Sequence, residues 1–105
     1  MTKKPRHASL DAPQPAPFAR IVLVCSKCMR KRDREDLRGD LRKALRQAGR
    51  KDVRVVVSGC LDLCPDDGIT VARGHDLGAD PARLHVFDAD GDIDDLARWA
   101  VQPLS

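Results

Sequence analysis

The feature that most constrains the fold of this chain is a pair of short apolar runs, each followed closely by two cysteines. The runs are residues 21–24 and 53–57, both rich in Val and Ile. The cysteines are Cys25 and Cys28 after the first run, and Cys60 and Cys64 after the second. Short runs of β-branched residues predict buried strands, so each cysteine pair is expected where a strand ends.

The segment between the two runs predicts a helix. Leu and Ala recur there at helical spacing from Leu37 to Ala48, Asp33 is placed to cap the helix, and Gly49 is placed to end it. A strand–helix–strand unit makes its two strands parallel, with a right-handed crossover. Both cysteine pairs are therefore expected at one edge of one sheet, where four thiols would converge.

Two further strands are predicted over residues 69–72 and 84–87, followed by a helix near residues 93–101 that Asp92 or Asp94 can cap. A chain of 105 residues is one domain. Residues 1–17 hold four of the seven prolines and no apolar period, so we expect a disordered or loosely docked arm before a folded domain at 18–105.

The cysteine content points to ligands rather than disulfides. Four cysteines in 105 residues are too few for a disulfide scaffold, and no signal peptide or membrane span is expected. We therefore expect a cytoplasmic protein. Cysteine thiolates bind zinc and [2Fe–2S] clusters alike, and a [2Fe–2S] cluster takes four thiolates, two per iron. Lys27 and residues 30–32 place positive charge near the first pair, which suits either anionic site.

This arrangement resembles the thioredoxin-like [2Fe–2S] ferredoxins, including small bacterial members in which only a few residues separate the first two cysteines. The resemblance rests on the two cysteine pairs in the strand–helix–strand unit and on the residues that follow them, Gly68, Ile69, Thr70 and Val71. The resemblance covers about residues 20–101. It implies an α/β thioredoxin-like fold, with a four-stranded mixed sheet and two helices in the order β-α-β-β-β-α. It also implies a [2Fe–2S] cluster on Cys25, Cys28, Cys60 and Cys64, electron transfer to a redox protein linked to flavin or NAD, and a homodimer. A small electron carrier or a redox or cluster sensor is expected, rather than a catalyst. The well-known members have a longer gap within the first pair than the two residues found here.

Two other functions remain open from the residues alone. In a dithiol oxidoreductase, Cys25 would be the nucleophile and Cys28 the resolving thiol, but Cys60 and Cys64 would then have no role. In a zinc-binding structural or adaptor protein, all four cysteines would hold zinc. Residues 1–51 carry 15 of the 19 Lys and Arg residues, yet the chain has only three aromatic residues for base stacking, so nucleic acid is not an expected partner.

Overall fold

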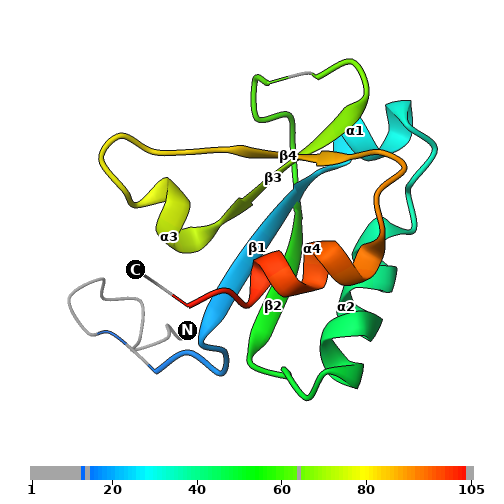
Figure 1. The fold of residues 1–105 in the computed structure, drawn as a ribbon. Coiled ribbons are helices and arrows are strands. Elements are labelled where there is room, and N and C mark those ends of the chain that lie inside the picture. The colour runs from blue at the N-terminus through cyan, green and yellow to red at the C-terminus, as the bar shows by residue number, and fades with distance from the viewer. Residues whose placement is uncertain (1–12, 14, 64, 104–105) are drawn as a thin grey trace, which may run out of the picture.

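Within the described residues, four strands form one mixed sheet with the order β2-β1-β3-β4, flanked by four helices (Figure 1). This computed structural model describes residues 13, 15–63 and 65–103. The strands are β1 (Arg20–Cys25), β2 (Val53–Ser58), β3 (Gly68–Arg73) and β4 (His85–Asp88). The helices are α1 (Ser26–Lys31), α2 (Leu37–Gln47), α3 (Gly74–Leu77) and α4 (Ile93–Ala100).

The pairing of the strands confirms the predicted parallel unit. β1 and β2 are parallel, with Cys25 opposite Ser58 at the last pair of the register. β3 is antiparallel to β1, and β4 is antiparallel to β3. All four strands lie where the apolar runs predict them, and the expected four-stranded mixed sheet is confirmed. Because β1 and β2 end together, the segments that follow them begin at the same edge of the sheet.

The core forms where α2 and α4 pack on the sheet and against each other (Figure 1). α2 contributes Leu37, Leu41 and Leu45, which are almost completely buried, as its helical stripe predicts. Gly49 ends this helix as expected, with a φ of 77° and a backbone N–H that donates to Arg46. α4 begins at Asp92, whose carboxylate accepts a hydrogen bond from the Asp94 N–H at 3.0 Å. The predicted cap of the last helix is therefore confirmed.

The prediction of two helices is wrong, because the described residues contain two more. α1 has six residues and α3 has four, which is too short for an apolar stripe to show in the sequence. The predicted cap at Asp33 is wrong as well. Asp33 has a φ of 55° and lies in the turn between α1 and α2, a conformation that Asp tolerates better than most residues. α2 begins only at Leu37, where its buried stripe starts.

The predicted N-terminal arm lies mostly outside the described residues, since residues 1–12 and 14 are not among them. In the part of the chain that the structure describes, no helix has the length and apolar character needed to cross a membrane.

Candidate metal centre

The first cysteine pair is buried at the junction of β1 and α1. Cys25 is the last residue of β1 and the residue that precedes α1, and Cys28 lies in the first turn of that helix. Their exposed fractions are 0% and 3%. The helix begins directly after the first thiol, so the two side chains are presented at the same edge of the sheet.

The segment that follows β2 reaches the first cysteine pair. The backbone N–H of Leu61 donates to the Cys25 sulfur. The Cys28 thiol lies 4.0 Å from the Leu63 carbonyl oxygen and 3.9 Å from Thr70 Oγ1. The Thr70 hydroxyl also donates to the Leu63 carbonyl, at 2.8 Å. These contacts bring the segment between Cys60 and Cys64 against the first pair, although 31 residues separate Cys28 from Cys60.

Hydrogen bonds around Cys25 favour its thiolate. Burial raises the pKa of the Cys25 thiol, but hydrogen bonds from Cys28, Leu61 and Lys27 outweigh burial and hold this pKa below its usual value. Most of these donors are backbone N–H groups. A sulfur that accepts several N–H hydrogen bonds is suited to carry negative charge, which a metal ligand must do.

The second pair is only partly described. Cys60 is exposed, and its sulfur accepts a hydrogen bond from the backbone N–H of Asp62 at 3.4 Å. Asp62 has a φ of 65°, which marks a tight turn between the two cysteines. Cys64 lies outside the described residues. Among the residues that are described, no three His, Cys, Asp or Glu side chains come together as a metal site. The convergence of four thiols therefore stays a prediction.

One basic residue after the first pair, Arg32, also contacts the second segment. Arg32 donates through Nη2 to the carbonyl of Pro65, at 2.9 Å, and so ties the end of α1 to the residue that follows Cys64. Lys27, Arg30 and Lys31 are exposed on α1. The predicted positive charge therefore lies beside the buried thiols.

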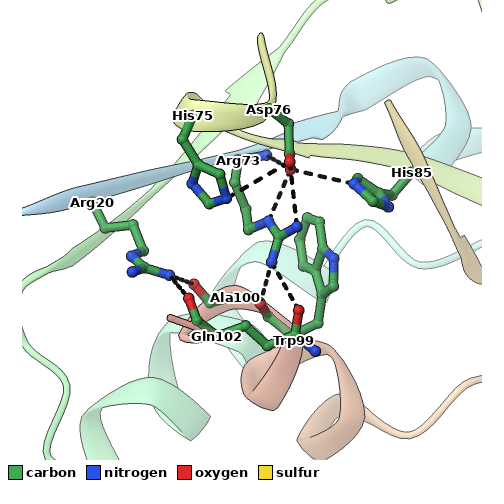
Figure 2. A network of polar contacts seen from close by, with 8 residues as sticks. All are labelled: Arg20, Arg73, His75, Asp76, His85, Trp99, Ala100 and Gln102. Atoms are coloured by element: carbon green, nitrogen blue, oxygen red, sulfur yellow. Dashed lines mark hydrogen bonds and ion pairs between the residues drawn. The ribbon is translucent and has the colours of Figure 1, made fainter. Parts of the chain in front are cut away.

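The sequence did not single out a second polar cluster, which is centred on Asp76 (Figure 2). The Asp76 carboxylate is 1% exposed and accepts from Arg73 Nε at 2.8 Å and Nη2 at 3.3 Å. His75 and His85 lie 3.7 Å and 3.4 Å from it, and the Arg73 guanidinium stacks on Trp99 at 4.4 Å. The only signal in the sequence is an Arg and an Asp three residues apart, a spacing that many surface turns share. Both histidines therefore contact Asp76 in this cluster, and neither is needed as a ligand beside the cysteines.

Comparison of the chain with protein-family models, with curated proteins and with solved structures finds no match. The resemblance to thioredoxin-like ferredoxins therefore rests on the residues quoted above.

Proposed function

We propose that this chain is a small [2Fe–2S] iron–sulfur protein with a thioredoxin-like fold, which carries single electrons or senses redox state or cluster supply. The proposed ligands are Cys25, Cys28, Cys60 and Cys64. The observation that carries the proposal is the contact between the two cysteine segments. The chain between Cys60 and Cys64 hydrogen-bonds to both sulfurs of the buried pair.

The order of the main elements supports the fold in this proposal. With the two short helices α1 and α3 set aside, the chain runs β-α-β-β-β-α. The four strands form a mixed sheet whose parallel pair carries the first cysteines at its carboxyl end. This is the arrangement that the resemblance to thioredoxin-like ferredoxins implies.

The surroundings of the buried pair suit an anionic cofactor. When bound, a [2Fe–2S] cluster supplies reversible one-electron chemistry, and the site gains one negative charge on reduction. The N–H groups of Lys27, Cys28 and Leu61 point to the Cys25 sulfur, and the cations of α1 lie nearby. Both features stabilise added negative charge, so they are expected to raise the reduction potential. The same cations would attract an acidic redox partner, linked to flavin or NAD.

Burial of the first pair argues against a dithiol oxidoreductase. A nucleophilic thiolate must reach a disulfide of its substrate, and reactive cysteines are partly exposed for this reason. Cys25 and Cys28 are instead almost completely covered. Zinc remains the second candidate cofactor, because the same four thiolates would hold it. We also propose that the protein is cytoplasmic, because a reducing compartment would keep all four thiols available as ligands.

The test is anaerobic purification of the chain, with a visible spectrum and assays of iron, zinc and acid-labile sulfide on one sample. We expect about two iron and two sulfide per chain, and a red-brown colour that dithionite bleaches. Each of the variants Cys25→Ser, Cys28→Ser, Cys60→Ser and Cys64→Ser should lose or destabilise the chromophore. Ser26→Ala, a change of one side-chain oxygen within the first pair, is the matched control and should keep it.

Other outcomes would overturn the proposal. A colourless protein with one zinc per chain would indicate the structural or adaptor function. A colourless protein that stays metal-free after reconstitution with iron and sulfide, and that forms a reducible disulfide between Cys25 and Cys28, would indicate dithiol chemistry. An unchanged spectrum in Cys64→Ser would exclude the ligand set of four cysteines.

A further inference from the structure

A groove between α2 and the start of β2 is lined by basic side chains. Its volume is about 300 Å³, and its apolar wall consists of Leu45, Val53 and Val55. The basic side chains around it are Arg42, Arg46, Arg50, Lys51 and Arg54. The groove lies near the first residues of β2, whereas the cysteine segments follow the last residues of β1 and β2. It is therefore separate from the candidate metal centre.

Two of the five cations are held in place by neighbours. Arg50 makes two hydrogen bonds to the carboxylate of Asp52, at 3.0 Å and 3.1 Å. The guanidinium of Arg54 lies over the ring of Phe18, with 4.7 Å between the guanidinium carbon and the ring centroid. Fixed cations lose less conformational freedom when they bind an anion, so these contacts prepare the groove for one.

The remaining cations have no counter-charge within the described part of the chain. Arg42, Arg46 and Lys51 make no side-chain hydrogen bond or ion pair there. Arg42 and Arg46 are also four residues apart on α2, where like charges repel and destabilise the helix. Among the residues that the structure describes, no carboxylate lines the groove. The arrangement costs stability in the isolated chain, and an anion seated between the cations would remove that cost.

We propose that this groove binds a small anion that carries two adjacent phosphate groups. Asp52 already balances Arg50, which leaves four positive charges around the groove. One phosphate group carries about −1.5 to −2 at neutral pH, so a single group leaves about half of that charge unbalanced. Two adjacent groups balance most of it, and guanidinium groups bind phosphate oxygens in pairs.

The groove suits a small diphosphate better than a nucleic acid. Its volume is at the lower end of the range for small-molecule sites. Single-stranded nucleic acid is bound through aromatic side chains that stack on bases. In the described part of the chain, no aromatic side chain lines the groove, and Phe18 lies against Arg54 instead.

The test is calorimetric titration of the purified chain with inorganic pyrophosphate and with ADP, at constant ionic strength near that of the cell. We expect one site per chain. The variant Arg42→Gln/Arg46→Gln should bind both probes at least about tenfold more weakly, because two charge-assisted contacts are lost. The control Arg83→Gln/Arg98→Gln removes the same charge from outside the groove and should bind within about twofold of the wild type.

A second measurement separates binding from a structural role of these arginines. Without phosphate, Arg42→Gln/Arg46→Gln should unfold at the same urea concentration as the wild type or a higher one, because a repulsive pair is removed. With pyrophosphate, the wild type and the control should gain more stability than Arg42→Gln/Arg46→Gln does. Equal affinity for both probes indicates recognition of the diphosphate alone, and tighter binding of ADP indicates added contacts to the nucleoside.

Three results would overturn the proposal: no binding of either probe at millimolar concentration, an equal loss of affinity in the control, or much tighter binding of a short RNA than of pyrophosphate. The last result would assign the groove to nucleic acid. None of these results depends on whether the cysteines hold a cluster, so failure here leaves the iron–sulfur proposal to its own test.

Discussion

Replacement of Asp76 by Asn tests the buried cluster of Figure 2 most directly. Asp76 is the only carboxylate that contacts Arg73 among the described residues, and both side chains are buried. Asn keeps the shape of the side chain but removes its charge, which leaves the Arg73 guanidinium buried without a counter-ion. Removal of one partner of a buried ion pair costs about 3–5 kcal/mol. We expect Asp76→Asn to lose about that much of the free energy of unfolding at pH 7.

The dependence of stability on pH gives a second measure of how much the ionised Asp76 carboxylate contributes to the free energy of unfolding. Burial by itself raises the pKa of Asp76, but hydrogen bonds from the Arg73 side chain and backbone, with the charges of Arg73 and His85, lower it from 3.8 to about 2. A carboxyl group with a lower pKa in the folded state stabilises the fold above pH 4 and loses this contribution as the pH falls toward 2. The difference between the two pKa values corresponds to about 2 kcal/mol of stability. The wild type should lose this contribution on acidification, whereas Asp76→Asn has no such contribution to lose.

The assay is urea unfolding at pH 7, 5, 4 and 2.5, followed by the fluorescence of Trp99, which stacks on Arg73. Asp95→Asn is the matched control, because Asp95 pairs with Arg98 on the exposed face of α4 and such pairs contribute at most about 1 kcal/mol. A cost of less than about 1 kcal/mol for Asp76→Asn at pH 7 would contradict a stabilising buried ion pair. So would a loss of stability between pH 5 and 2.5 that is as large in Asp76→Asn as in the wild type.

The remaining predictions concern packing, capping and acid sensitivity. Leu41→Ala removes a fully buried side chain of α2 and should cost about 2–5 kcal/mol in urea unfolding, whereas a cost below 1 kcal/mol would contradict the described core. Asp92→Ala removes the cap of α4 and should cost about 1 kcal/mol in the same assay, and an unchanged midpoint would show that the cap contributes nothing. Gly49→Ala forces a side chain into a left-handed turn and should cost about 1–2 kcal/mol, where a gain in stability would contradict the φ of 77°. Burial lowers the pKa of His75, as do the charges of Arg73, Arg20 and Arg83, and these effects outweigh the opposing carboxylate of Asp76. The unfolded chain therefore takes up a proton at His75 before the folded one does, and the fold should begin to lose stability as the pH falls below 6.5. His75→Gln should remove that part of the loss in urea unfolding.

The sequence predicted the strands, the main helix and their order because those features depend on local periodicity. Runs of β-branched residues predict strands, and the spacing of Leu37, Leu41 and Leu45 predicts a helix. Neither prediction depends on contacts with distant parts of the chain. The parallel pairing of β1 and β2 follows from the helix between them. The two short helices could not be predicted, because a helix of one or two turns leaves no repeat in the sequence.

Part of the candidate metal site was also predictable. The position of each cysteine pair after a strand followed from the apolar runs, and so did the expectation that both segments begin at one edge of the sheet. The sequence could not show that the Leu61 N–H and the Leu63 carbonyl reach the first two sulfurs, because these contacts depend on how the segment after β2 turns.

Contacts between distant residues were decided by the tertiary structure alone. The pairing of Arg73 with Asp76 is local, but its burial under Trp99 and beside His85 requires α4 and β4 to pack against β3. The basic groove likewise needs the end of α2 to lie beside the start of β2. A sequence records which residues carry charge, whereas only packing decides whether that charge is buried, paired or gathered around a cavity, since those outcomes depend on segments far apart in the chain.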